Sequence, residues 1–116
     1  MPTTPLLPLL QGYLKVTSDR QQMVAANIAN VDTPGYHTKD INFKAAMQRV
    51  IDQRNQFQFE PVSTEIDGLP ERPDGNNVNI DREGMMLAET QLQYQMGVQL
   101  IKAEFHRLLT AIKEGN

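Results

Sequence analysis

The stretch Ala26-Asn-Ile-Ala-Asn-Val-Asp-Thr-Pro-Gly-Tyr36 contains the clearest structural signal in the chain, because a helical pattern ends inside it. Pro34 followed by Gly35 is the residue order of a type II turn, since proline fixes φ and glycine tolerates a positive φ. The residue before a proline is also disfavoured in the α conformation. We therefore expect a helix to end before Pro34 and the chain to change direction there.

Upstream of this turn, the pattern predicts one amphipathic helix from about Leu9 to Val31, with Pro8 in its first turn. Its apolar residues follow steps of three and four, with Thr17 and Gln21 filling the gaps. The resulting stripe consists of Leu10, Leu14, Val24, Ile28 and Val31. Residues 1–8 contain three prolines, so we expect this segment to be extended or disordered.

Residues 36–80 are expected to form a connector that is largely extended and irregular. A short helix is predicted from Asp40 to about Asp52, with the side chain of Asp40 capping its free N–H groups. Phe57 and Phe59 alternate with polar residues and give a weak strand signal. Three of the seven prolines and two of the seven glycines lie in residues 61–75, which argues against a helix or a central strand there.

The last third of the chain, residues 81–116, predicts a second long helix that continues to Ile112 and has Asp81 as its N-cap. Its apolar residues keep a heptad spacing that is interrupted once, at Gln91. This seam consists of Leu87, Tyr94, Val98, Ile101, Phe105, Leu108 and Ile112.

The two long helices are expected to pack as a coiled-coil-like pair, parallel or antiparallel, in a mainly α fold with one helical core formed by residues 9–35 and 81–116. Only 6% of the residues are aromatic and none is tryptophan, so a large dense core is not expected. A single seam offsets little of the backbone entropy lost on folding. We therefore expect the remaining apolar surface to be buried against copies of the chain or against partners.

Composition excludes several other classes of protein. A chain of 116 residues is one domain at most, and its net charge of −3 argues against nucleic-acid binding and against direct binding to anionic lipid. The absence of cysteine removes disulfides, thiolate catalysis and cysteine-ligated zinc. No apolar run approaches the ~20 residues that span a bilayer. The N-terminal residues lack the basic region and cleavage site of a secretory signal, so we expect none.

We predict no catalytic, metal-binding or cofactor-binding residues. His37 and His106 lie far apart in the sequence and fit no catalytic pattern. Asp74-Gly-Asn-Asn-Val-Asn-Ile-Asp-Arg-Glu83 is rich in possible oxygen ligands for calcium. It lacks the glycine at position six of a calcium loop and has Val78 at position five, so we expect turns and a helix cap instead.

On these residues alone, two classes of function stay open. One is a subunit that completes its burial on assembly, and the other is a self-contained helical hairpin that acts as an adaptor or chaperone. The hairpin predicts a cooperatively folded monomer or dimer, whereas an enzyme would need a convergent polar site that these residues do not supply. In the segment Ala25-Ala-Asn-Ile-Ala-Asn-Val31, the small alanines at positions 25, 26 and 29 would let another backbone come close.

The stretch from Ala26 to Tyr36 closely resembles the N-terminal signature of the bacterial flagellar axial proteins, the rod and hook family. The residues that match this signature are Asn27, Asn30, Asp32, Pro34, Gly35 and Tyr36. Within that family, Asp74-Gly-Asn-Asn-Val-Asn-Ile-Asp-Arg-Glu83 and Leu92-Gln-Tyr-Gln-Met-Gly97 are similar to segments of the proximal rod proteins.

The resemblance implies a structural subunit of the flagellar rod, the drive shaft that crosses the periplasm. Such subunits are exported by the flagellar type III apparatus without cleavage of a signal, and their terminal helices stack into a helical tube. The implied partners are copies of the chain, the rod proteins FlgC and FlgF, FliE, and the membrane-ring and export-gate base. We expect Asn27 and Asn30 to form inter-helix hydrogen bonds in the assembled rod, and Pro34 and Gly35 to redirect the chain out of the tube.

Overall fold

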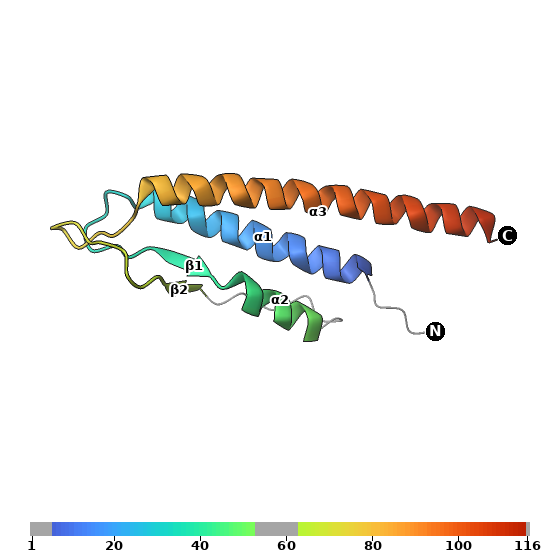
Figure 1. Ribbon diagram of the computed structural model, residues 1–116, viewed down its shortest axis with the longest axis horizontal. Coiled ribbons are helices and arrows are strands. Elements are labelled where there is room, and N and C mark those ends of the chain that lie inside the picture. Colours follow the sequence, from blue (N-terminus) through green and yellow to red (C-terminus); the bar gives the residue numbers. More distant parts are fainter. Residues whose placement is uncertain (1–5, 53–62, 116) are drawn as a thin grey trace.

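The computed structural model describes residues 6–52 and 63–115. In chain order, the elements are α1 (Leu6–Ala29), β1 (Lys39–Ile41), α2 (Phe43–Asp52), β2 (Ser63–Glu65) and α3 (Ile80–Glu114). The molecule measures 68 × 24 × 18 Å, and α1 and α3 run side by side in opposite directions along its long axis (Figure 1). The predicted mainly α fold with paired terminal helices is confirmed, and the pairing is antiparallel.

Helix α1 begins at Leu6, earlier than the expected start near Leu9, and Pro8 lies in its first turn, where a missing N–H breaks no helical bond. The helix ends at Ala29. The N–H of Tyr36 donates to the carbonyl of Thr33 at 3.2 Å, and Gly35 between them has a φ of +76°. The chain therefore turns where the Pro-Gly order predicts.

The connector contains a short helix and a two-stranded ribbon. Helix α2 begins at Phe43, and the side chain of Asn42 accepts a hydrogen bond from the N–H of Ala45 at 3.0 Å. The prediction that Asp40 caps this helix is wrong, because Asp40 lies in β1 and binds Arg20 of α1 instead.

Strand β1 pairs antiparallel with β2, with Lys39 opposite Glu65. In the sequence, β2 lies between Pro61 and Pro70, which is compatible with the edge of a ribbon although not with a central strand. The predicted strand at Phe57 and Phe59 lies outside the described residues.

Helix α3 has 35 residues and is therefore about 52 Å long at 1.5 Å per residue. Its N-cap is Asn79, whose side chain accepts from the N–H of Arg82 at 3.0 Å, so the prediction of Asp81 as the cap is wrong by two positions. Asp81 lies instead in the first turn with Glu83, where negative charge favours the positive end of the helix dipole.

The apolar core is small and lies between α1, β1 and α2. Its buried residues are Val16, Ile41, Ala46 and Val50, and Leu9, Phe43 and Met47 pack against them. Between α1 and α3 the buried positions of α3 recur every seven residues and are polar or small: Glu83, Thr90, Gly97 and Glu104. At Gly97 the two helices approach so closely that an added Cβ would lie 2.6 Å from the side chain of Leu14.

Helix α3 extends well past the described part of α1. Glu83 contacts Asn27 and Gly97 contacts Leu14, so the antiparallel register places Leu6 opposite about residue 104. Residues 105–114 project beyond that point, as Figure 1 shows at the C-terminal end. This last part of α3, which we call the overhang, has no helix beside it within the described residues.

Candidate functional site

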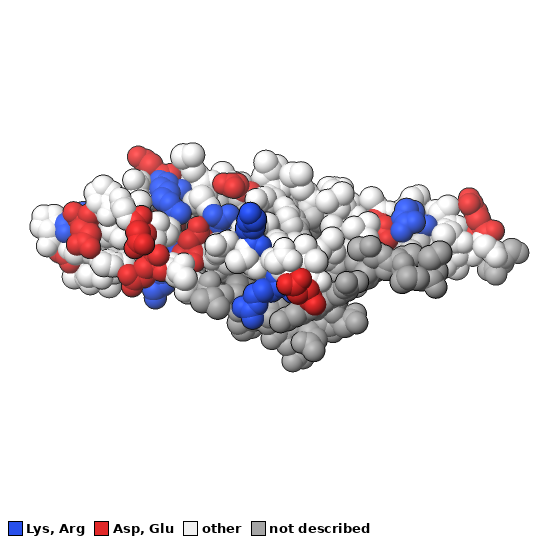
Figure 2. Space-filling model, turned by 60° about the horizontal axis from the view of Figure 1, so that its bottom comes forward, with Lys and Arg blue, Asp and Glu red and all other residues white. Residues whose placement is uncertain are grey.

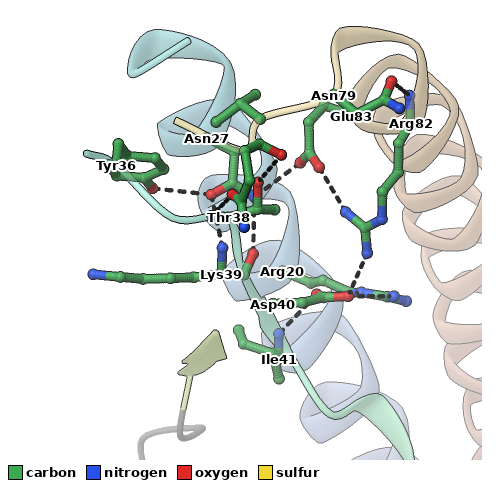
Figure 3. A network of polar contacts seen from close by, with 12 residues as sticks. Arg20, Asn27, Tyr36, Thr38, Lys39, Asp40, Ile41, Asn79, Arg82 and Glu83 are labelled. Atoms are coloured by element: carbon green, nitrogen blue, oxygen red, sulfur yellow. Dashed lines mark hydrogen bonds and ion pairs between the residues drawn. The ribbon is translucent and has the colours of Figure 1, made fainter. Parts of the chain in front are cut away.

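Asn27 lies at the C-terminal end of α1, fully buried, and uses its whole amide within the chain (Figure 3). Its Nδ2 donates to the carbonyl of Lys39 and to Oε1 of Glu83, both at 2.8 Å. Its Oδ1 accepts from the hydroxyl of Tyr36 at 2.9 Å and from the N–H of Lys39 at 3.1 Å. An amide has two donor and two strong acceptor positions, so Asn27 is satisfied. It joins α1 to β1 and to α3.

Beside Asn27, acidic and basic side chains alternate in a connected series of hydrogen bonds and ion pairs (Figure 3). Glu83 is fully buried, and its Oε2 accepts from Nη1 of Arg82 at 2.6 Å. Arg82 also reaches Asp40 at 3.4 Å, and Asp40 accepts from Nε and Nη2 of Arg20 at 2.9 and 3.0 Å. We call this network the junction; it consists of Arg20, Asn27, Tyr36, Lys39, Asp40, Arg82 and Glu83.

The junction shifts the pKa values of Asp40, Arg20 and Tyr36. Burial raises the pKa of Asp40, but the hydrogen bond and charge of Arg20, the N–H of Ile41 and the charge of Arg82 outweigh it, so the net pKa is lowered. The hydrogen bond to Asp40 raises the pKa of Arg20 against the opposing effect of burial. Burial, followed by the charge of Glu83, raises the pKa of Tyr36, so its hydroxyl stays a donor. The ion pair therefore persists through neutral pH.

The loop before α3 is tied to the signature turn through buried asparagines that the sequence did not single out. Asn76 is fully buried, and its Nδ2 donates to the carbonyls of Asn30 and Thr33 at 2.9 and 2.8 Å. Asn77 accepts from the N–H of Thr38 at 2.6 Å. The only sequence signal for these contacts is the density of asparagine in residues 76–79, which also fits an ordinary turn.

The possible calcium ligands of this loop are used as turn and cap groups. Oδ1 of Asp74 accepts from the N–H of Asn76, and Oδ1 of Asn76 accepts from the N–H of Val78. Among the residues that the structure describes, no group of three His, Cys, Asp or Glu side chains is placed to hold a metal ion. The segment thus acts as the structural connection that its turn residues predict.

Of the signature residues, Asn27 and Tyr36 belong to the junction, whereas Asn30, Asp32, Pro34 and Gly35 lie around the turn. Asn30 donates to the carbonyl of Ala26 at 2.8 Å and accepts from the hydroxyl of Thr33 at 2.9 Å, so its side chain holds the end of α1. Asp32, Pro34 and Gly35 are exposed. Of the two asparagines expected to bond between helices, Asn27 forms such a bond inside this subunit, to Glu83 of α3.

The two predicted apolar seams are covered to different extents. In α1, Leu10 and Val24 are buried, and Ile28 and Leu14 are half-buried, as is Val31 in the turn after it. In α3, Leu87, Val98 and Ile101 are half-buried. The remaining seam residues are exposed, and they are Tyr94, Phe105, Leu108 and Ile112.

Helix α3 thus presents two exposed apolar surfaces. The overhang carries Phe105, Leu108, Leu109 and Ile112, with 52%, 36%, 55% and 64% of their surface exposed. A second row, the outer stripe, consists of Met85, Leu92, Met96 and Leu100. Between Gly84 and Ile101 the helix has one charged residue, Glu89, whereas acidic and basic side chains are numerous at the loop-bearing end of the molecule (Figure 2). Exposed apolar rows of this kind mark interaction surfaces.

None of the described helices combines the length and the apolarity that crossing a bilayer requires.

Comparisons with known proteins place these features in a family. A family model described as flagella basal body rod protein matches residues 14–37, which run from α1 through the signature turn. The flagellar basal body rod protein FlgB of Escherichia coli K12 is 30% identical over 126 aligned residues, and 91% of each chain is covered. The FlgB proteins of Salmonella typhimurium and of Buchnera aphidicola are 31% and 29% identical, over 91% and 89% of this chain.

Proposed function

The chain belongs to the FlgB family of flagellar basal body rod proteins, and on this premise we propose that the exposed apolar residues of α3 join it to neighbouring subunits of the rod. It is a structural subunit of the flagellar basal body rod, and the family assembles there with other rod components. The observation that supports the proposal is the overhang, where half or more of the surface of Phe105, Leu109 and Ile112 is exposed.

The overhang is suited to receive a helix of another subunit. It continues α3 past the end of the described α1, so an occupying helix would extend the line of α1 without displacing it. Burying apolar surface contributes roughly 25 cal/mol per Å², and four large side chains therefore supply several kcal/mol to an interface. A self-contained hairpin would have covered these residues itself.

The signature turn and α1 supply a second part of the proposed interface. Ala25, Ala26 and Ala29 are exposed on α1, and their small side chains allow a neighbouring backbone to come close. In the proposed role, Pro34 and Gly35 redirect the chain out of the helical tube and Asn30 holds the end of the helix in place. Asp32 and Tyr36 flank this change of direction.

The finer partners and the location follow from the same family role. We propose contacts with copies of the chain, with FlgC and FlgF, and with FliE and the membrane-ring and export-gate base. The proposed place is the periplasmic rod, reached through the flagellar type III apparatus without cleavage of a signal. We assign no catalytic role and no cofactor, because the family is one of structural rod proteins.

The proposal is tested by placing a charge on the overhang. Phe105→Asp should leave the free energy of unfolding of the isolated subunit within about 0.5 kcal/mol of wild type, because the side chain is exposed there. Incorporation into purified basal bodies and swimming should be lost, because assembly would bury the charge. Ile101→Asp is a weaker test, since Ile101 is already half-buried in the subunit.

His106→Asp is the matched control. It places the same charge on the next residue of α3, which is exposed and not part of the apolar rows. This variant should fold, enter basal bodies and support swimming. Wild-type incorporation of Phe105→Asp would contradict the proposal.

A further inference from the structure

His37 lies directly after the signature turn with a carboxylate at each ring nitrogen. Nδ1 is 3.2 Å from Oε1 of Glu65, in β2, and Nε2 is 3.1 Å from Oε2 of Glu71, in the loop between β2 and α3. Glu65 and Glu71 lie close together in the sequence, in β2 and in the loop that follows it, whereas His37 lies 28 positions before Glu65. None of them takes part in the junction or in the apolar rows of α3.

The two contacts together require the charged form of the ring. A neutral imidazole carries one N–H, and its other nitrogen is an acceptor, whereas an ionised carboxylate only accepts. With neutral His37, one of the two carboxylates would face a lone pair. With imidazolium, Nδ1 donates to Glu65 and the protonated Nε2 faces the opposite charge of Glu71. We propose that His37 and its two carboxylates form a pH-dependent contact, which we call the clip. When His37 is charged, the clip holds the loop of residues 66–75 on the β ribbon, and when His37 is neutral, one carboxylate is released.

The surroundings of the ring favour the charged form. The groups that face it are Glu65 from β2, and Glu71 and the backbone of Gly75 from the loop. The hydrogen bond to Glu65 raises the pKa of His37 above its ordinary value against a smaller opposing effect of burial, and the charges of both carboxylates add to the increase. The nearest basic side chain of the loop, Arg72, is paired with Asp74.

The direction of the pH effect follows from that raised pKa. The contribution of the clip is complete below the ordinary histidine pKa of about 6.5 and is lost as the pH rises through the higher folded pKa. Backbone hydrogen bonds from Ile66 to Thr38 and from Gly35 to Asp74 do not depend on this proton. Deprotonation therefore loosens the loop without unfolding it, and it leaves an uncompensated carboxylate on an already acidic end of the molecule (Figure 2).

The first test is an NMR titration of the two histidine rings in the full chain, because His106 is an internal reference. The midpoint of His37 should lie above the ordinary histidine value of about 6.5. Glu65→Gln and Glu71→Gln should each lower the midpoint of His37 and leave the signals of His106 unchanged. Glu89→Gln, an exposed change on α3, should not alter the midpoint of His37. A His37 midpoint at the ordinary value, or one unaffected by Glu71→Gln, would overturn the clip.

The second test measures whether the proton acts on the loop. Amide-exchange protection factors of residues 66–75, corrected for intrinsic pH dependence, should be roughly two- to fivefold higher at pH 5.5 than at pH 8.5, as for a surface ion pair. In His37→Gln this difference should disappear, whereas His106→Gln should retain it. Equal amide-exchange protection of residues 66–75 in wild type and His37→Gln at pH 5.5 would show that the contacts of His37 do not stabilise the loop.

Discussion

Asn27 shows how one side chain can hold three segments together at the scale of a residue. Its amide binds both backbone groups of Lys39, as a neighbouring strand would, and it also binds Tyr36 and Glu83. No aliphatic residue of the same size could satisfy these groups, and each buried group left unpaired costs about 1–3 kcal/mol. The signature asparagine is therefore required for the fold of the subunit itself.

Asn27→Asp should destabilise the subunit by about 2–4 kcal/mol at neutral pH, because it replaces the donor to Glu83 by a second buried acidic group. Thermal or denaturant unfolding followed by circular dichroism measures the change. Gln22→Glu, the same change in charge at an exposed position of α1, should stay within about 0.5 kcal/mol of wild type. Equal stabilities of the two variants would show that the buried network contributes nothing.

Asp40→Asn should lower the free energy of unfolding by about 1–2 kcal/mol at pH 7, because it removes the charge that Arg20 and Arg82 bind. The pKa of Asp40 is lowered in the folded chain, so its contribution is present above the unfolded pKa of about 3.9 and is lost as the pH falls through the folded value.

The difference in the free energy of unfolding between wild type and Asp40→Asn, measured by denaturant unfolding, should therefore decrease towards pH 2. Asp67→Asn, in the exposed part of the loop, should show no such pH-dependent difference. A constant difference across this pH range would contradict the assigned role of Asp40.

At the scale of an element, α3 contains two different heptad patterns. The apolar pattern was visible in the sequence, but the line that α3 buries consists of Glu83, Thr90, Gly97 and Glu104. Gly97 permits the close approach of α1, and Glu83 is held by the junction. These contacts therefore determine which face of α3 packs on α1, and part of the apolar pattern stays exposed.

The two glycines inside α3 should respond oppositely to alanine. Gly84→Ala should raise the free energy of unfolding by about 0.5–1 kcal/mol, because an added Cβ meets nothing within 4 Å and alanine is the better helix former. Gly97→Ala should lower it by about 1–2 kcal/mol, because the Cβ would overlap Leu14 and the ring of Tyr13. Denaturant unfolding of both variants gives the comparison, and a stabilising Gly97→Ala would argue against the close helix contact.

The helix caps are the features of these elements that could not be predicted from the local sequence. The existence of all three helices could be predicted from periodicity, but Asp40 and Asp81 were assigned as caps where Asn42 and Asn79 serve. Acidic and amide side chains cap comparably well, so local preference does not separate them. The choice is made by Arg20, which binds Asp40 in β1 and thereby shifts the start of α2.

At the scale of the whole molecule, the chain is far from a compact sphere. Its radius of gyration is 18.0 Å, whereas a compact chain of this length has about 13 Å. The excess comes from the antiparallel pair and from the overhang that extends past it (Figure 1). An elongated subunit with an uncovered helix end is consistent with a structural subunit of the flagellar rod.

Amide exchange along α3 should report this incomplete burial. Residues 84–100, which pack on α1, should be protected in the isolated subunit, whereas residues 105–114 should exchange fast, since a helix segment of this length is marginal in water without packing. The same amides should become protected in isolated basal bodies. Strong protection of residues 105–114 in the dilute subunit would mean that the overhang is covered without assembly.

The two terminal helices, the turn at Pro34 and Gly35, the lack of a large core and the family could be predicted from the amino-acid sequence, because these depend on periodicity, on backbone restrictions and on a specific local motif. Only the folded chain shows which face of α3 is buried, which asparagines hold the loop and which residues bind Asp40. Those outcomes depend on contacts between residues such as Asn27 and Glu83, which lie 56 positions apart. A local pattern contains no information on such a pairing, since any exposed polar residue fits the same pattern until the helices are placed together.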